Sequence, residues 1–300
     1  MPLSTAKDVT IEHSLPRRTL RSLQYLLARL TSRDGYVEAP AAPFDLTFKG
    51  PAADCITRHI FRLGAHEPLL TRYLVEHIRL GPRDVALDIG ANLGWYSVLL
   101  DRLSSPGARI LAFEPDPESF RLLNVNLQLN SVSSVTSLNI ALGEIPGSAE
   151  LRRYNSNNNG CHTLFAGGNS EGGVVSVPVD TAARIWEAEH LGERPLKFMK
   201  IDVEGYEYFV LKGAAGLLKR CECVVLEYTP DALQLAGVGD SALLDCLRDA
   251  GLTAHCFEEH RLRPISFDEL ASQRTQRDLI LTRSPETSAL SAPPGAQSSL

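Results

Sequence analysis

The sequence lacks clustered basic residues and long uninterrupted apolar stretches, and each absence excludes a class of function. Thirty Lys and Arg stand against thirty-six Asp and Glu, giving a net charge of −6, and the cations are not grouped as phosphate binding requires. A nucleic-acid partner is therefore not expected. The most apolar early stretch, Leu20 to Leu30, is interrupted by Arg21, Gln24 and Arg29, which suits neither a secretion signal nor a membrane span. We expect a cytoplasmic protein with no membrane insertion.

Paired cysteines are also missing. The six cysteines are scattered, none forms a CxxC pair, and several lie inside apolar runs such as residues 221–226. This usage is typical of small buried side chains in a reducing compartment rather than of a disulfide framework or a zinc site. No cluster of His and acids stands at metal-ligand spacing, so no metal is expected.

Short β-branched apolar runs alternate with helical periodicity from about residue 83 to residue 283. The pattern predicts strands at 85–89, 109–114, 135–141, 198–203, 223–228, 253–257 and 278–282, and helices at 94–103, 117–130, 206–219 and 242–250. Alternating strands and helices predict an α/β fold with an open, mostly parallel sheet covered on both faces. The last two strands have no good helix between them, which favours a hairpin ending the sheet.

Three segments depart from this alternation. Residues 1–50 are predicted to form an N-terminal helical extension, because five leucines between Leu20 and Leu30 fall at helical spacing. Packing of that face on the core or on a partner is favoured over a membrane surface, and a homodimer is one possibility. The main domain is expected to span 51–284, and 285–300, rich in Pro, Ser and Ala, to be a disordered tail.

Within the main domain, residues 143–196 are expected to be an insert on the acceptor side. Two extra strands are predicted there, at 150–153 and 174–179, separated by a polar stretch rich in asparagine. Residues 66–68, His-Glu-Pro at a helix start, are a candidate for part of a lid.

A glycine-rich loop follows the first predicted strand, in the segment Asp88-Ile-Gly-Ala-Asn-Leu-Gly94. Such a loop presents free backbone N–H groups and a helix N-terminus to a ligand, and glycine lets the ligand approach the main chain. Asp88 at the strand end would repel a phosphate and attract a cation. Asn92 tolerates left-handed backbone angles, and its amide offers polar contacts. With Gly90 and Gly94, these residues are candidates for binding a cofactor.

A second acid, Glu114, closes the next strand about twenty residues after Gly94, where a carboxylate accepts hydrogen bonds from a ribose diol. A ribose beside a loop that carries an acid indicates adenosine joined to a cationic group, which describes S-adenosylmethionine. Two alternatives stay open. One is a nicotinamide-dependent oxidoreductase, and the other is a Rossmann-like domain in which Asp88 caps a helix and Glu114 is a surface acid.

Candidate catalytic groups follow the fourth predicted strand of the main pattern. If the strand continues, Lys200, Asp202 and Glu204 share one face near its carboxyl end, where ligands bind in such sheets. Asp202 is the favoured base or orienting acceptor for a hydroxyl, with Glu204 in support. The alternative is an internal ion-pair network that positions the next helix.

Further candidates lie on the acceptor side. His162 is a possible base because its pKa suits proton transfer near neutrality, although a lone loop histidine is commonly solvated. Glu227, which ends the following strand, is expected in the neighbouring position across the sheet, as either an acceptor contact or a cap. Asn158 and Asn159 could bind sugar hydroxyls, but Asn-Gly is also an ordinary turn.

Several motifs together resemble the FkbM family of S-adenosylmethionine-dependent methyltransferases. They are LDIGANLGWYS at 87–97, AFEPD at 112–116, NIALG at 139–143, FMKIDVEGYE at 198–207 and VVLEY at 224–228. The resemblance covers roughly residues 67 to 283. It implies a Rossmann-like class I methyltransferase fold with a seven-stranded sheet whose last strand is antiparallel.

The resemblance also implies roles for residues. Asp88, Gly90, Asn92 and Gly94 would hold the methionine part of the donor, Glu114 with the adjoining Pro115 the ribose, and the main chain near Ala141 the adenine. Asp202 would lie close to the donor as well. Members typically methylate an oxygen, often a hydroxyl of a sugar or natural product. We therefore expect an O-methyltransferase acting on a glycan or small-molecule acceptor, with a non-catalytic adenosyl-ligand or partner-binding protein as the alternative.

Overall fold

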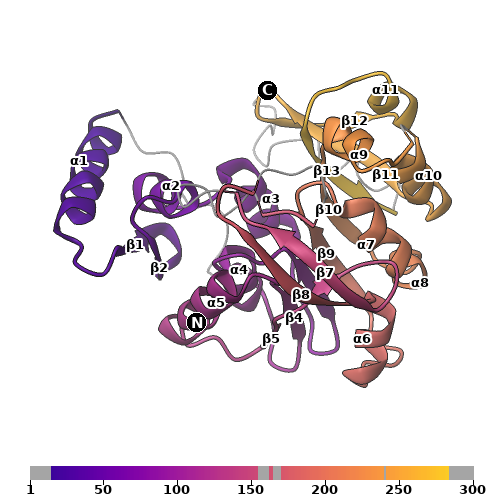
Figure 1. The fold of residues 1–300 in the computed structure, drawn as a ribbon, viewed down its shortest axis with the longest axis horizontal. Coiled ribbons are helices and arrows are strands. Elements are labelled where there is room, and N and C mark those ends of the chain that lie inside the picture. Colours follow the sequence, from indigo (N-terminus) through magenta and orange to yellow (C-terminus); the bar gives the residue numbers. More distant parts are fainter. Residues whose placement is uncertain (1–14, 155–161, 165–169, 240, 284–300) are drawn as a thin grey trace, which may run out of the picture.

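A computed structural model describes residues 15–154, 162–164, 170–239 and 241–283 (Figure 1). The predicted tail at 285–300 lies outside the described residues. At the centre is an eight-stranded sheet in the order β12-β11-β13-β10-β9-β3-β4-β5. Its strands are β3 (Val85–Ile89), β4 (Arg109–Phe113), β5 (Val135–Leu138), β9 (Leu196–Ile201), β10 (Cys223–Tyr228), β11 (Thr253–Glu258), β12 (Arg261–Ile265) and β13 (Arg277–Thr282).

The sheet has the predicted class I methyltransferase arrangement. Strands β5, β4, β3, β9 and β10 are parallel, and β13 is antiparallel to β10. One strand more than predicted is present, because β12 pairs antiparallel with β11 at the sheet edge. The predicted final hairpin is therefore wrong in detail: β11 and β13 do pair antiparallel, but β12 and the helix α11 (Phe267–Ala271) lie between them in the chain.

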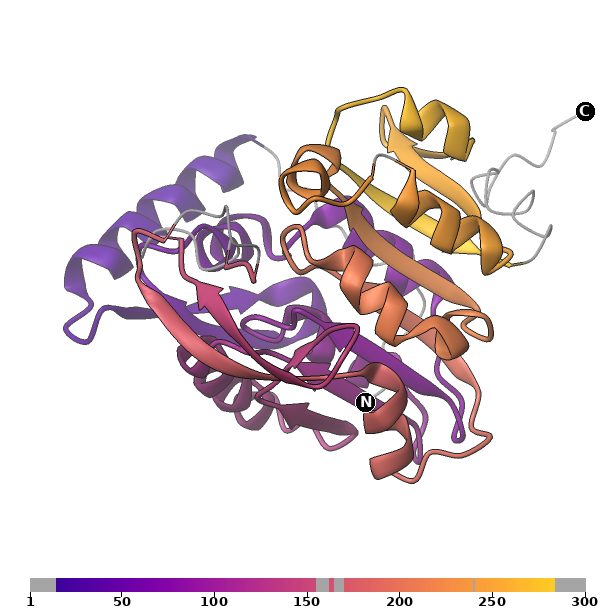
Figure 2. The ribbon, with the colours of Figure 1, turned by 45° about the vertical axis from the view of Figure 1, so that its right-hand side comes forward.

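Helices cover both faces of this sheet (Figure 2). One apolar core lies under α3 (Pro68–His77), α4 (Trp95–Arg102) and α5 (Pro117–Leu129). A second lies under α6 (Ala182–Ala188), α7 (Glu207–Gly213), α8 (Ala215–Leu218), α9 (Pro230–Leu235) and α10 (Ala242–Asp249). In the fully buried β3, Ala86 belongs to the first core, while Val85 and Leu87 belong to the second. A strand buried on both faces explains its continuous apolar run.

Two predicted strands end early, for local reasons. The strand predicted at 135–141 divides into β5 and β6 (Ala141–Leu142), and between them the Asn139 amide donates to the carbonyl oxygens of Glu114 and Pro115 at 2.8 and 3.0 Å. The strand predicted at 198–203 ends at Ile201. Glu204 then takes a left-handed φ of 52°, which an extended strand cannot hold.

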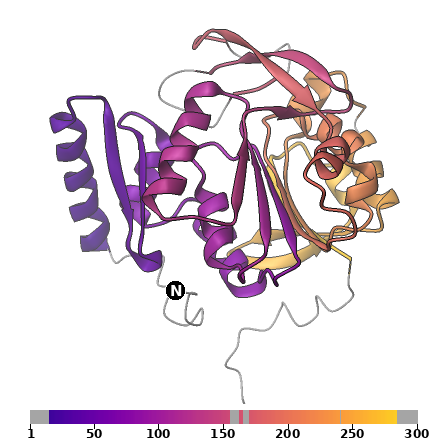
Figure 3. The same ribbon diagram turned by 90° about the horizontal axis from the view of Figure 1, so that it is seen from below.

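The insert forms a small sheet of its own, in the order β6-β8-β7, with β7 (Gly147–Arg152) and β8 (Val174–Asp180) close to the two strands predicted there. The asparagine-rich stretch at 155–159 lies outside the described residues. Figure 3 shows this sheet on the side of the molecule opposite the two described chain ends.

The first fifty residues contain more than the predicted helix. Helix α1 (Leu15–Thr31) is followed by the hairpin of β1 (Tyr36–Ala41) and β2 (Leu46–Pro51), then by α2 (Cys55–Leu63). The hairpin shares the first core, because Phe48 packs on Trp95 with ring centroids 5.0 Å apart and Asn126 bonds to the main chain of Lys49. Among the described residues, no helix is both long and apolar enough to cross a membrane.

Candidate functional site

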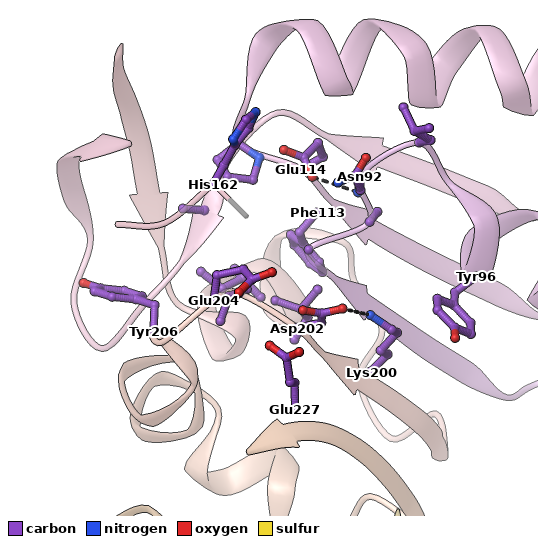
Figure 4. Close-up of a pocket in the computed structure, with 18 of the residues that line it drawn as sticks. Asn92, Tyr96, Phe113, Glu114, His162, Lys200, Asp202, Glu204, Tyr206 and Glu227 are labelled. Carbon is purple, nitrogen blue, oxygen red and sulfur yellow. Dashed lines mark hydrogen bonds and ion pairs between the residues drawn. The ribbon is translucent and has the colours of Figure 1, made fainter. Parts of the chain in front are cut away.

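A cavity of about 1160 Å³, counted with its opening to solvent, lies at the carboxyl ends of β3, β4, β9 and β10 (Figure 4). This is the edge at which ligands bind in open α/β sheets. Of the residues predicted for the site, the walls include Gly90, Asn92, Glu114, Pro115, Ala141, His162, Asp202, Glu204 and Glu227. Asn158 and Asn159 lie outside the described residues.

The glycine loop forms the floor of the cavity. Gly90 has a φ of 84°, and a Cβ there would lie 1.8 Å from the main-chain oxygen of Asp202. Only glycine lets the two strand ends approach this closely. Asn92 follows with a φ of 49°. Gly94 differs from expectation in position: it does not line the cavity but packs against Leu123 of α5, which a Cβ would meet at 2.6 Å.

Asp88 lies beneath the loop rather than on the cavity wall. Its side chain is fully buried, and the Ser97 hydroxyl donates to its Oδ2 at 2.6 Å, which ties β3 to the first turn of α4. Burial raises the pKa of Asp88, against an opposing effect of Lys200. Its Oδ1 has no hydrogen-bond partner among the described residues. That buried oxygen is available to accept a bond from a group that enters the loop.

Glu114 is held by two backbone donors. Its Oε2 accepts from the N–H of Asn92 and its Oε1 from the N–H of Asp116, both at 2.8 Å, and only 6% of the residue is exposed. Burial raises the pKa of Glu114 to about 8, although these two bonds favour the anion. Pro115 and Ala141 line the wall beside it. The carboxylate is thus fixed in place at the end of β4, as the sequence predicts.

Three acids meet on the opposite wall. Carboxylate oxygens of Asp202, Glu204 and Glu227 lie within 4.8 Å of one another. The Nζ of Lys200 forms an ion pair with the Oδ2 of Asp202 at 2.6 Å. The predicted alternation along one strand face does not produce this group, because β9 ends at Ile201 and a turn follows. Glu227 comes from the neighbouring parallel strand β10, in the position that the sequence predicts for it.

The three acids have unequal electrostatic surroundings. Burial raises the pKa of Glu227 to about 10, and the charges of Asp202, Glu204 and Glu207 act in the same direction. Glu227 therefore carries a proton at neutral pH. Asp202 lies beside a cation: burial alone would lower the pKa of Lys200, but Asp202 and other acids raise it. The site therefore places Glu227, whose carboxyl favours the protonated form, beside an acid that is paired with a lysine.

His162 reaches the cavity from the insert. Its Nδ1 accepts from the main-chain N–H of Tyr154 at 3.2 Å, and burial lowers its pKa, so the ring is neutral near pH 7. The neighbouring Thr163 hydroxyl donates to the main-chain oxygen of Glu204 at 2.6 Å. The insert is thereby bonded directly to the loop that carries the acids.

One cluster in the cavity was not predicted as part of the chemistry. Glu67, at the start of α3, has a left-handed φ of 43° and accepts a hydrogen bond from the Tyr96 hydroxyl. The Lys200 ammonium lies 4.8 Å from the centre of the Tyr96 ring, which continues the chain of contacts to Asp202. Burial would raise the pKa of Glu67, but His66 and Lys200 outweigh it and the net shift is downward. The His-Glu-Pro run at a helix start was the only sequence signal.

Comparison with known proteins identifies similar methyltransferases. Residues 88–252 match the family model of the methyltransferase FkbM domain. A hexuronic acid methyltransferase, AglP of Haloferax volcanii, is 27% identical over 179 residues, covering 59% of this chain and 67% of that protein. Methyltransferase 1 of Beauveria bassiana is 30% identical over 143 residues, and the match spans 42% of this chain and 57% of that one.

Two further comparisons concern proteins named for FkbM. The 31-O-demethyl-FK506 methyltransferase FkbM of Streptomyces tacrolimicus is 43% identical over 54 residues, which is 18% of this chain and 20% of that protein. The crystal structure of a methyltransferase FkbM from Methylobacillus flagellatus is similar with a TM-score of 0.43 and 14% identity, covering 89% of this chain and 58% of that one.

Proposed function

Because this chain belongs to the FkbM methyltransferase family, we propose that it transfers the methyl group of S-adenosylmethionine to a hydroxyl oxygen of a sugar or natural product. The observation that most supports this donor is the position of Glu114. Its carboxylate is held by backbone donors at the end of β4, one strand away from a glycine loop. That placement suits a ribose diol, which donates two hydrogen bonds. Family membership argues against the nicotinamide oxidoreductase considered from the sequence.

The cavity fits the donor in two further respects. Gly90 lets the loop pack against the main chain of Asp202, and the backbone of Gly90, Ala91 and Asn92 then lines the cavity, where the methionine part can lie against it. The unpartnered Oδ1 of Asp88 offers an acceptor under that loop. On the proposed placement, adenine lies along Pro115 and Ala141, and the cationic sulfonium faces the wall that carries Asp202.

The reaction requires positioning and one proton acceptor. As the acceptor oxygen bonds to the methyl carbon, the carbon–sulfur bond breaks, and the sulfonium becomes a neutral thioether. The new ether oxygen is positively charged and releases its proton late, so an ordinary carboxylate is a sufficient base if it lies within hydrogen-bond distance. Asp202 has this role because it lies on the cavity wall and forms an ion pair with Lys200 at 2.6 Å. Glu204 and the neutral Glu227 orient the acceptor hydroxyl.

The acceptor class rests on the relatives and on the insert. One relative is named for a hexuronic acid and another for an FK506 precursor, and both names describe oxygen-rich acceptors. In this chain the acceptor would enter between the acids and the insert, where His162 and Leu164 line the cavity. A neutral His162 can accept a proton or a hydrogen bond from such a molecule.

Calorimetric titration with S-adenosylmethionine and, separately, with NAD tests the donor. We expect heat from the adenosyl ligand alone, weakened at least tenfold by Glu114→Ala and unaffected by Glu193→Ala, a control at a side chain that is 98% exposed. Transfer of a radiolabelled methyl group to a panel of glycosides and polyols then tests the acceptor. Absence of donor binding, or full binding by Glu114→Ala, would refute the proposed donor site.

A further inference from the structure

Helix α1 presents its apolar side to solvent. Leu20, Leu23, Leu26, Leu27 and Leu30 are between 50% and 74% exposed, and together they form one continuous stripe, the α1 leucine face. Figures 1 and 3 show α1 at the outer edge of the molecule, away from the central sheet. An apolar stripe of this kind normally faces a core. Its outward position indicates that another surface covers it.

The opposite side of α1 is held firmly, so the leucines cannot turn inward. The Tyr25 hydroxyl donates to the main-chain oxygen of Ala52 at 2.8 Å, and its ring packs edge-on against Phe61 with centroids 5.3 Å apart. Arg62 donates to the Ser22 hydroxyl at 2.9 Å. The buried Tyr25 and these bonds fix the rotation of α1 on α2 and the hairpin.

The spacing of the leucine face is that of a helix pair. Leu20, Leu23, Leu27 and Leu30 follow intervals of three, four and three, which is the a/d pattern of a two-helix seam. The residues beside the seam are Thr19, Gln24, Leu26 and Thr31, all uncharged. Two copies can therefore meet along this face without opposing like charges.

The charges of α1 argue against a lipid surface. Arg18 and Arg21 are partly buried on the anchored side, and Arg29 lies on the same half of the helix by its spacing from Tyr25. A membrane-bound amphipathic helix places its cations along the borders of the apolar face, where they reach lipid headgroups. Here Thr19, Gln24 and Thr31 flank the seam, Arg18 and Arg21 lie on the anchored side, and among the described side chains of α1 only the exposed Arg29 is a cation near the border.

We propose that the α1 leucine face binds the same face of a second copy of this chain, forming a two-fold dimer. Pairing five leucines from each copy with their uncharged neighbours buries on the order of 1,000 Å² in total, the lower limit for a specific interface. The proposed dimer interface is also connected to the cavity through α2. Helix α1 packs on α2, and Cys55 and Ile56 of α2 line the cavity wall.

Light scattering coupled to size exclusion tests the dimer with the full chain. We expect twice the 32.8 kDa mass of one chain for the wild type, and the mass of one chain for Leu23→Glu/Leu27→Glu. Because both leucines are exposed, the substitutions should leave the melting temperature of the monomer within a few degrees. The matched control is Ile145→Glu/Leu235→Glu, which changes two apolar side chains that are 73% and 69% exposed on other surfaces. This control variant should remain dimeric.

A charge-exchange experiment shows whether the occupant is a second copy. Leu23→Lys/Leu27→Lys should be monomeric alone and form a heterodimer when mixed with Leu23→Glu/Leu27→Glu, because opposite charges then face each other across the seam. A monomeric wild type, a dimer that persists in the glutamate variant, or no heterodimer on mixing would overturn the proposal. Wild-type protein that floats with anionic vesicles as a monomer would assign the face to lipid instead.

Discussion

The proposed donor side and the proposed acceptor side of the cavity are built in different ways. On the donor side, the loop 90–94 and Glu114 are held largely by main-chain groups, such as the Asn92 N–H that donates to the Glu114 carboxylate. On the acceptor side, side chains from distant segments hold one another, as Glu67 holds Tyr96 and Lys200 holds Asp202. Main-chain contacts do not depend on the identity of the side chains, so they suit a ligand that related proteins share. A side-chain network can change with its acceptor.

The two sides also differ in why their acids hold protons. Glu114 has a raised pKa, about 8, because it is buried, and a ligand that donates hydrogen bonds can restore its charge. Glu227 has a pKa of about 10 because burial is reinforced by Asp202 and Glu204. Glu114 is thus expected to lose its proton when the donor binds, whereas Glu227 is expected to keep its proton.

The largest expected effect is on the donor side, from Gly90→Ala. The new Cβ would meet a backbone oxygen at 1.8 Å at a φ of 84°, so neither side of the contact can yield cheaply. We expect a loss of stability on the order of 3–5 kcal/mol and no measurable binding of S-adenosylhomocysteine. Chemical denaturation and calorimetry measure both quantities.

Gly216→Ala is the matched control for that substitution. A Cβ at Gly216, inside α8, meets nothing within 4 Å, and alanine in a helix should be neutral or slightly stabilising. If Gly90→Ala bound the ligand normally, the close approach of the two strand ends would not be a requirement of the donor side.

The next largest effect should come from the acceptor side. Asp202→Asn keeps the shape of the side chain but removes the charge that pairs with Lys200 and accepts the proton. We expect kcat for methyl transfer to fall by about 10²–10⁴, with a much smaller change in donor affinity. Asp231→Asn, at an exposed acid of α9, should leave both unchanged. An Asp202→Asn enzyme with normal kcat would remove Asp202 from the mechanism.

Donor binding should depend on pH through Glu114. The free enzyme holds this carboxyl protonated below a pKa of about 8, and the ribose diol binds best to the anion. Binding therefore releases a proton, and affinity for S-adenosylhomocysteine should rise, by several-fold, from pH 6 to pH 8.5. Glu114→Gln should bind more weakly and with a flatter pH profile, as titrations in buffers of different ionisation enthalpy would show. An equally steep profile in the variant would assign the proton elsewhere.

The unexpected Glu67 cluster allows a test that separates the two sides. Tyr96→Phe removes the hydroxyl that holds Glu67 but keeps the ring beneath Lys200. Losing one such bond to a charged group is worth about 1.5–3 kcal/mol. We expect KM for the acceptor to rise about tenfold while affinity for S-adenosylhomocysteine is retained. The reverse result would place Glu67 on the donor side.

The same division explains what the sequence could predict. Gly90, Asn92 and Glu114 were predicted because their roles follow from strand ends and backbone angles close together in the chain. The neighbouring position of Glu227 was predicted too, because consecutive parallel strands end at the same edge of the sheet, whereas the meeting of Glu67 with Tyr96 depends on how distant segments pack. No spacing rule encodes that contact. The φ of 43° at Glu67 has no local signal either, since a glutamate in that conformation is held only by its surroundings.

The last expected effect concerns the pH dependence of stability, from Glu227→Gln. The folded protein holds the Glu227 proton up to a pKa of about 10, whereas an unfolded glutamate loses it near 4.5. A raised pKa contributes stability that is complete below the unfolded value and is lost as the pH rises toward the folded one. Glutamine resembles the protonated acid and has no such loss, so the variant should match the wild type near pH 5 and become more stable relative to it as the pH rises.

The difference in the free energy of unfolding between the variant and the wild type should grow by at most about 1.4 kcal/mol per pH unit, the limit for a single proton. Relaxation of the site will offset part of this difference. Urea denaturation of both proteins at pH 6, 7.5 and 9 measures it. Glu150→Gln, at a side chain 70% exposed on the insert, should show no divergence from the wild type. Parallel stability curves for Glu227→Gln and the wild type would mean that Glu227 is ionised beside Asp202. Glu227 on the acceptor side would then be ionised, as Glu114 on the donor side is expected to be once the donor is bound.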